Sequence, residues 1–273
     1  NNSSNNASDY NTIFGEGVMG TGTVAGANWN TGMGYTCLQD VTNGDGNAAF
    51  GAKSLLNLTE GTENVAIGKS AGEAITTANK TIFIGTSAGE AVTVTNSAES
   101  DFTIGIGYNA LVSLTSGQGN VAIGAYALDA EDDGDWSTAV GYQALTAQTG
   151  TTGGVWNVAL GYQAGVAITK GRYNVAIGTR ALYTEDLGDV ATAVGTQALY
   201  SQNSGSDNVS TNNTGIGKAA GFFNVTGVNN TYVGRHAGFG VSGKSHSGCV
   251  FIGANAGLTA YTGDNNIAIG YQA

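Results

Sequence analysis

The chain has 273 residues, of which 45 are glycine, none is proline and only 11% are charged. The glycines follow no Gly-X-Y period, which excludes collagen, and an apolar content of 41% is too high for a disordered polar tract. The formal net charge is −11, and the nine Lys and Arg are scattered singly. This pattern argues against nucleic acid and anionic membranes as partners, because both attract clustered cations. No apolar run approaches the length of a membrane span, so we expect no membrane insertion.

A nine-residue motif, which reads NVAIGTRAL at 174–182, recurs along almost the whole chain. A turn-forming residue is followed by three residues that end in a large apolar side chain, then an invariant Gly, two variable residues, and Ala before Leu or Gly. The invariant glycines are Gly15, Gly34, Gly51, Gly68, Gly85, Gly107, Gly124, Gly141, Gly161, Gly178, Gly195, Gly217, Gly234, Gly253 and Gly270. Nine of the fourteen intervals between them are 17 residues and none is shorter. A fixed minimum with occasional additions indicates one structural unit per repeat, with insertions such as 93–101 and 202–212 looped out at one corner.

The residues before each invariant Gly, which we number as position 0, predict a short strand. Position −1 is large and apolar in all fifteen copies, as in Ile67, Ile123 and Ile177, and position −3 is mostly Val or Thr. Because side chains alternate across a strand, these two positions share one face, which we expect to form the core. Position −2 is usually Ala and almost never charged, so we expect the opposite face to pack on a neighbouring chain; a harmless surface Ala is the alternative.

Three other positions of the repeat carry structural expectations. Position −4 is Asn in ten copies, which suits a turn into a strand, and stacked Asn side chains can form a hydrogen-bonded ladder. Position +3 is small, mostly Ala, which keeps the unit narrow. The invariant Gly is expected to turn the corner or to allow close approach of a neighbouring backbone.

The repeat as a whole predicts an all-β fold, a parallel β-solenoid of about fifteen coils over residues 11–273. A unit of 17 residues cannot bury a core alone, but stacked units pair strand on strand, and no segment shows a useful helical period. Residues 1–10 are expected to connect this domain to the rest of a longer fibre. Cys37 and Cys249 fall in the second and fourteenth coils, too far apart for an intrachain disulfide.

Four units, NVAIGKSAG, NVAIGAYAL, STAVGYQAL and NVALGYQAG, resemble the SVAIG-type head repeats of YadA-like trimeric autotransporter adhesins. They are still more similar to the TAVGYQAL-type repeats of bacteriophage tail fibres and spikes. The resemblance covers residues 11–273, although the 17-residue spacing is longer than that of the adhesin repeat. It implies a homotrimer of left-handed parallel β-rolls that acts as a rod or as a receptor-binding head.

Two ladders of aromatic residues at equal register are the best candidate binding sites. Trp136, Trp156 and Tyr173 all fall at position −5 of three consecutive coils, where an exposed strip would dock sugar rings and a buried one would only pack. These three are the candidate receptor-binding residues. Tyr183, Tyr200, Phe222 and Phe239 fall at position +5 of four consecutive coils, and there we expect packing.

Other constellations give little support for chemistry, so we predict no enzyme, no metal site and no cofactor. The acidic run at 129–135 lacks the spacing of an EF-hand and reads as a solvated loop. His236 and His246 are the only histidines, and His236 is expected to be exposed rather than a general base. Paired carboxylates across a cleft, which a glycosidase needs, cannot be placed from the sequence.

The repeat and the resemblance together predict the structural and adhesive part of a trimeric extracellular fibre. The first expectation is a phage tail fibre or spike on the virion surface that binds a glycan or protein of the host surface. Two alternatives remain, namely a bacterial adhesin head on the cell surface and a polysaccharide-degrading tail spike. An ice-binding solenoid ranks last because the Thr residues form no sustained TxT array.

Overall fold

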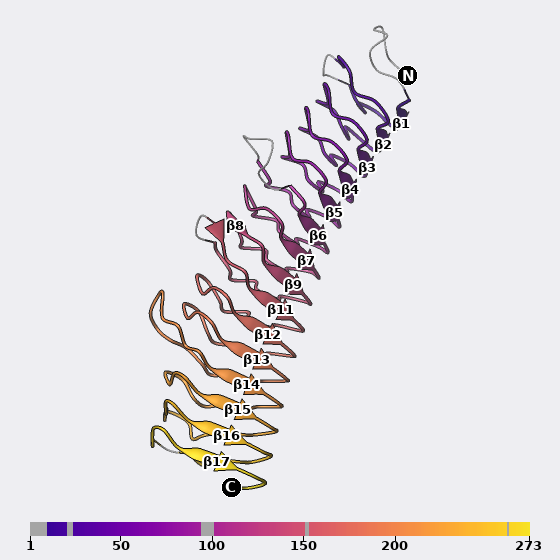
Figure 1. The fold of residues 1–273 in the computed structure, drawn as a ribbon. Helices are drawn as coiled ribbons and strands as arrows, with labels where there is room; N and C mark the ends of the chain where they lie inside the picture. The colour runs from indigo at the N-terminus through magenta and orange to yellow at the C-terminus, as the bar shows by residue number, and fades with distance from the viewer. Residues whose placement is uncertain (1–9, 21–23, 94–100, 151–152, 261) are drawn as a thin grey trace. The chain divides into compact units, whose positions relative to one another are not determined.

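The structure is a computed structural model that describes residues 10–20, 24–93, 101–150, 153–260 and 262–273. The described residues contain no helix and form a parallel β-solenoid of about 14 turns with a repeat of about 17 residues, which confirms the predicted architecture (Figure 1). Most of the predicted connecting segment 1–10 and of the insertion 93–101 lies outside the described residues.

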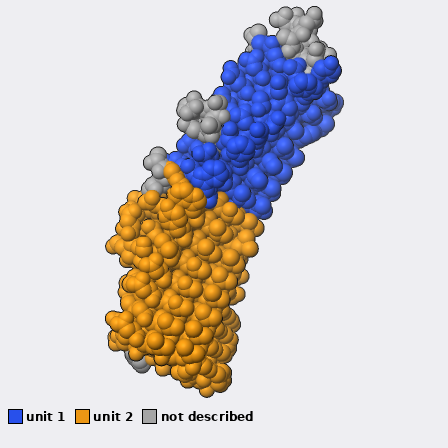
Figure 2. Space-filling view, in the orientation of Figure 1, with its two compact units in different colours: residues 1–136 blue, residues 137–273 orange. Residues whose placement is uncertain are grey.

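The chain divides into two compact units, Asn1–Trp136 and Ser137–Ala273, which Figure 2 shows in blue and orange. The strands of unit 1 are β1 (Thr12–Phe14), β2 (Thr31–Met33), β3 (Ala48–Phe50), β4 (Val65–Ile67), β5 (Ile82–Ile84), β6 (Ile104–Ile106), β7 (Val121–Ile123) and β8 (Gly134–Asp135). Those of unit 2 are β9 (Thr138–Val140), β10 (Gly153–Gly154), β11 (Val158–Leu160), β12 (Val175–Ile177), β13 (Thr192–Val194), β14 (Thr214–Ile216), β15 (Thr231–Val233), β16 (Val250–Ile252) and β17 (Ile267–Ile269).

Within each unit, the three-residue strands pair in parallel with the strands of the neighbouring coils. In unit 2, for example, Val175 lies opposite Thr192, and Ile177 lies opposite Val194. Residues at the same repeat position are therefore neighbours from coil to coil, as the register analysis predicted. Every side chain of the repeat consequently belongs to a ladder, with a spacing close to the roughly 4.8 Å between strands.

The prediction that position −1 fills the core is wrong. The middle residue of the strand, at position −2, is the buried one, whereas Ile67 and Ile123 at position −1 are 41% and 38% exposed and Ile177 is half-buried. Side chains do alternate across the strand, but the inward and outward faces are the reverse of the prediction. The prediction assigned the larger side chains to the interior. The inside of the coil is narrow, so it accepts Ala at −2 and leaves the bulky aliphatics outside.

The narrow interior explains why positions −2 and +4 complement each other. Position +4 is a buried Leu in many coils, such as Leu182, where −2 is Ala. Where −2 is a buried aromatic, as in Phe83 and Tyr232, position +4 is Gly. A Cβ added to Gly89 would lie 2.5 Å from Cδ1 of Phe83, so the ring occupies the space that a side chain at +4 would need.

The invariant Gly permits both the turn and the close approach that the sequence suggested. Gly178 has φ +126°, and a Cβ added to it would lie 2.6 Å from the carbonyl carbon of Gly195 in the next coil. The same positive φ recurs at Gly68, Gly124, Gly141, Gly161 and Gly195. Any L side chain at this position would be strained in its backbone and would clash with backbone that cannot yield.

The predicted Asn ladder is present inside the coils at position −4. Nδ2 of Asn64 donates to Oδ1 of Asn47 at 3.0 Å, and Nδ2 of Asn47 donates to Oδ1 of Asn30 at the same distance. The backbone N of Asn64 donates to Oδ1 of Asn47 as well, at 3.0 Å. Each buried amide is thus satisfied by its neighbours, which makes Asn the suitable polar residue at a buried corner.

Candidate functional site

The candidate residues at position −5 are exposed, as a binding strip requires. Trp156 and Tyr173 in unit 2 are 46% and 50% exposed, and their rings stack with centroids 5.1 Å apart and an interplanar angle of 11°. Trp136 belongs to unit 1, where it is also exposed and its indole covers the backbone of Gly119. The predicted stacking is confirmed for the pair in unit 2, which offers a flat aromatic surface.

The backbone turns these aromatic side chains outward. Trp136, Trp156 and Tyr173 all have left-handed backbone, with φ between 52° and 62°. This conformation costs a non-glycine residue about 1–2 kcal/mol, and hydrogen bonds to the preceding coil hold it in place. The backbone N of Trp136 donates to O of Gln118 and that of Tyr173 donates to O of Val155, both at 3.0 Å.

The ladder at position +5 packs, as predicted. Tyr183, Tyr200, Phe222 and Phe239 are half-buried and stack face to face from coil to coil. The centroid distances are 4.9, 4.8 and 5.1 Å along the series. Rings stacked in this way cover each other's faces, so the ladder stabilises the coils and leaves little aromatic face for a ligand.

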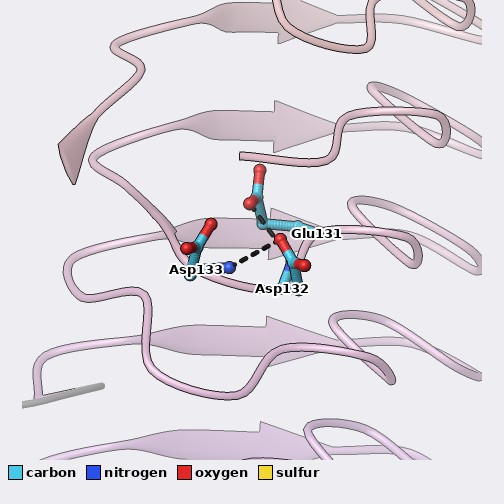
Figure 3. Close-up of side chains that lie close together, drawn as sticks. All are labelled: Glu131, Asp132 and Asp133. Carbon is cyan, nitrogen blue, oxygen red and sulfur yellow. Dashed lines mark hydrogen bonds between the residues drawn. The ribbon is translucent and has the colours of Figure 1, made fainter. Parts of the chain in front are cut away.

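The acidic run forms a compact cluster around Glu131, Asp132 and Asp133, whose carboxylate oxygens lie within 4.8 Å of one another (Figure 3). Oε1 of the fully buried Glu131 accepts from the backbone N of Gly134 at 2.8 Å, and Oδ1 of Asp132 accepts from the backbone N of Asp133 at 2.9 Å. Burial, and then the charges of Asp132 and Asp135, raise the pKa of Asp133. The cluster therefore uses its carboxylates to close a turn, and it does not by itself define a cation site.

A second exposed strip, which the sequence analysis missed, lies at positions +1 and +2 of each repeat; we call it the post-strand corner. Tyr142 and Tyr162 at +1 are exposed and stacked, with centroids 5.7 Å apart. At +2, Nε2 of Gln163 donates to Oε1 of Gln143 at 2.9 Å, and Nε of Arg180 donates to Oε1 of Gln163 at 3.0 Å. The signal was available in the dipeptide Tyr-Gln, which occurs at equal register in two neighbouring coils.

The side chains of unit 1 and unit 2 that are best suited to acid–base or nucleophilic chemistry, one histidine and two cysteines, are buried inside the coils. His246 is buried, and its Nε2 lies 2.7 Å from Oη of the buried Tyr232, whose pKa burial raises. Both cysteines are free and buried, and burial raises the pKa of the Cys37 thiol to about 11. A thiol at that pKa is a weak nucleophile at neutral pH.

A hollow of about 510 Å³ lies beside the last turn. Its lining has no acidic, His or Cys side chain and consists of Asn255, Gly257, Leu258, Thr259, Ala260, Gln272 and Ala273.

Comparisons with protein-family models, with curated proteins and with solved structures gave no match. Among the described residues, no helix has the length and apolar character to cross a membrane. The case for a function consequently depends on the surface of the solenoid: an apolar sheet face, and an exposed strip at each end of the strands.

Proposed function

We propose that this chain is a segment of an extracellular fibre that assembles as a homotrimer and attaches to a host surface. The observation that carries the proposal is the outer face of the sheet, formed by positions −1 and −3. In unit 2 its outward side chains are Val, Ile, Leu or Thr in every coil, and Leu160, Ile216 and Ile252 are 44%, 42% and 37% exposed. Unit 1 has the same residue types except for Phe14, Met33, Ala48 and Phe50.

An apolar face of this kind supports association between chains. Aliphatic side chains at equal register form a continuous stripe along the strands of each unit, whereas soluble monomers rarely expose contiguous apolar patches of more than a few hundred Å². The sequence predicts an intermolecular contact at position −2, but that position lies inside the coil. The proposed contact is therefore at −1 and −3, where larger side chains have more area to bury. The choice of three chains comes from the resemblance to trimeric fibre and adhesin repeats.

Adhesion is the second part of the proposal, and the stacked pair Trp156 and Tyr173 supports it. Exposed aromatic rings with an apolar face and polar edges suit the ring faces of sugars or the apolar side chains of a protein. Three chains would present three copies of each site, so weak single contacts would add up through avidity. A phage tail fibre or spike is the proposed setting, with a bacterial adhesin head as the second candidate.

The assembly is tested by measuring the mass of the protein in solution. Wild type should be a trimer, and the double variant Leu160→Asp with Ile216→Asp should be monomeric, because a buried carboxylate without a partner strongly disfavours the interface. The matched control is Thr179→Asp with Thr196→Asp, which adds the same charge at exposed positions beside the sheet face and should remain trimeric. A wild-type protein that is a stable monomer would contradict the proposal.

The adhesive role is tested by binding to an array of surface glycans and to host cells. Trp156→Ala should weaken binding about tenfold, since stacking on an aromatic contributes on the order of 1–1.5 kcal/mol. Tyr35→Ala is the control, because it removes an aromatic ring of similar exposure from another repeat position, +1 in unit 1. Equal binding by wild type and Trp156→Ala would remove the aromatic strip from the site. Release of reducing ends from capsule or lipopolysaccharide would instead favour the degrading spike.

A further inference from the structure

The positive charges of unit 2 concentrate on its post-strand corner. Unit 2 has six Lys and Arg, and three of them, Arg180, Lys218 and Arg235, occupy position +1 or +2. No Asp or Glu occurs between positions −3 and +6 of any repeat in this unit. Its acidic residues all lie in the other half of the coil, and they are Glu185, Asp186, Asp189, Asp207 and Asp264.

The fold brings two of these cations to neighbouring levels of the solenoid. Strands β14 and β15 pair directly, so Lys218 and Arg235, both at +1 and both exposed, stand about one strand spacing apart, roughly 5 Å. The backbone N of His236 donates to O of Lys218 at 2.9 Å. Partial burial, and then the charges of Arg235 and Lys218, lower the pKa of His236, which is consistent with the closeness of the three groups.

Arg180 is held in place two coils earlier on the same corner. Its guanidinium lies 5.7 Å from the ring centroid of Tyr162 and 5.4 Å from that of Tyr183, and its Nε donates to Gln163. Among the residues that the structure describes, the one ion pair joins Lys53 to Glu73, in unit 1. The cations of the post-strand corner in unit 2 therefore have no carboxylate partner within the described part of the chain.

We propose that the post-strand corner of unit 2 is a binding site for an anionic polysaccharide. The inference rests on the proposed adhesive function and names the ligand class. Arg180, Lys218 and Arg235 would pair with the carboxylate, sulfate or phosphate groups along the sugar chain. The hydroxyls of Tyr142 and Tyr162, with the amides of Gln143 and Gln163, offer hydrogen bonds to sugar hydroxyls.

A linear acidic glycan fits this corner better than a nucleic acid does. Three cations in single file, with two neighbouring and one set apart, suit a chain with a charge on some of its sugar units. Duplex DNA carries about one charge per 1.7 Å of its axis and needs a denser row of cations.

The test uses the assembled protein and four probes: a short oligogalacturonate, its fully methyl-esterified neutral form, chondroitin sulfate, and a short duplex DNA. Wild type should bind oligogalacturonate or chondroitin sulfate, which distinguishes carboxylate from sulfate, and should not bind the neutral ester or DNA. The double variant Lys218→Ala with Arg235→Ala should bind at least tenfold more weakly, since each charge-assisted hydrogen bond contributes about a factor of ten. Arg180→Ala should weaken binding about tenfold as well.

The matched control is Lys170→Ala with Lys244→Ala, which removes the same charge from unit 2 at exposed positions away from the post-strand corner. Equal loss of binding in the control and test pairs, equal affinity for the neutral ester, preferential binding of DNA, or no binding of any anionic probe would each overturn the proposal. The mass in solution and the effect of Trp156→Ala on the binding of host cells are measured in parallel. If those results hold while the anionic probes fail, the ligand class is wrong and the fibre proposal stands.

Discussion

Residues 1–136 and 137–273 follow the same repeat, yet the two units differ in charge and in the filling of one interior position. Unit 1 carries fifteen acidic residues and three Lys, for a formal charge of −12, whereas unit 2 carries five acidic residues and six Lys and Arg, for a charge of +1. Both histidines are in unit 2. The negative net charge of the chain therefore comes entirely from unit 1.

The interior difference lies at position +7, which is buried in most of the described coils of both units. In unit 1 its occupants are Val41, Leu58, Ile75, Val92, Leu114 and Glu131, and in unit 2 they include Gln148, Ile168, Glu185, Gln202 and Asn224. The polar residues of unit 2 are hydrogen-bonded across coils. Nε2 of Gln202 donates to Oε2 of Glu185 at 3.0 Å, and Oε1 of Gln202 accepts from Nδ2 of Asn213 at 2.9 Å.

This difference shows which parts of the repeat are fixed. The Gly at position 0 is dictated by backbone contacts between coils, and the narrow interior limits the combined size of the residues at −2 and +4. Position +7 tolerates an aliphatic or a polar residue, provided that the neighbours in the same register satisfy the polar one. The outer corners tolerate either sign of charge, so the same scaffold can carry an acidic surface in one unit and a cationic strip in the other.

Substitutions that exchange an aliphatic for a polar residue at position +7, or the reverse, should have the largest effect on the free energy of unfolding. Leu58→Gln removes a buried Leu whose neighbours in the register, Val41 and Ile75, are aliphatic. The buried amide finds no partner there, which should lower the free energy of unfolding by about 3–5 kcal/mol. Gln202→Leu leaves Glu185 and Asn213 each short of one partner and should cost about 2–3 kcal/mol. Urea unfolding of the full chain measures both changes.

Ile168 provides the comparison for this exchange, because it is the fully buried aliphatic residue at +7 within unit 2. Ile168→Gln should cost less than Leu58→Gln, because Gln148 and Glu185, its neighbours in the register, offer hydrogen-bond partners to the new amide. An equal cost for the two variants would show that the neighbours in the register do not decide which residue position +7 tolerates, and it would break the comparison.

The sequence predicted the fold far better than it predicted the surface. The fixed interval between glycines, the Asn at −4 and the period-2 strand specified the solenoid, its register and its ladders, because each reflects a backbone requirement repeated in every coil. The phase of the strand was wrong, since Ile177 looks like a core residue next to Ala176 until the width of the coil is known.

Side-chain groupings that depend on three dimensions were harder to predict. Trp156 and Tyr173 were identified by register. Their exposure depends on a left-handed backbone conformation, which cannot be predicted from Trp or Tyr at that position. Lys218 and Arg235 are 17 residues apart and look scattered in the sequence, although equal register places them side by side. Aligning the charges by repeat position, as we aligned the aromatics, would have revealed the cationic corner.

Acidification should affect the two units in opposite directions. Burial lowers the pKa of His246 below its ordinary value of 6.5, with Asp264 opposing the shift. The unfolded chain therefore binds the proton more readily, and stability contributed by the neutral His246 is lost as the pH falls below 6.5. In unit 1 the raised pKa of Asp133 has the reverse effect, because protonation of that carboxylate in the folded state favours folding at acidic pH.

Hydrogen exchange resolved by peptide, at pH 7.5 and 5.5 with correction for the intrinsic rate, measures this difference. Protection should fall in the coils around His246 and stay level or rise in unit 1. His246→Gln should abolish the fall, whereas His236→Gln, at a more exposed site, should leave most of it in place. A uniform loss of protection across both units would mean that His246 is not the responsible group.

Salt should produce the smallest effect, and it tests the charge difference directly. The fifteen acidic residues of unit 1 repel one another, and added salt shortens the screening length from about 10 Å at 0.1 M to about 3 Å at 1 M. Protection in unit 1 should therefore rise with sodium chloride by a few tenths of a kcal/mol, while unit 2, at +1, should change little. Sucrose serves as the control, because it favours burial in both units without screening charge. If sodium chloride raised protection equally in the two units, the response would be general and self-repulsion in unit 1 would not be its cause.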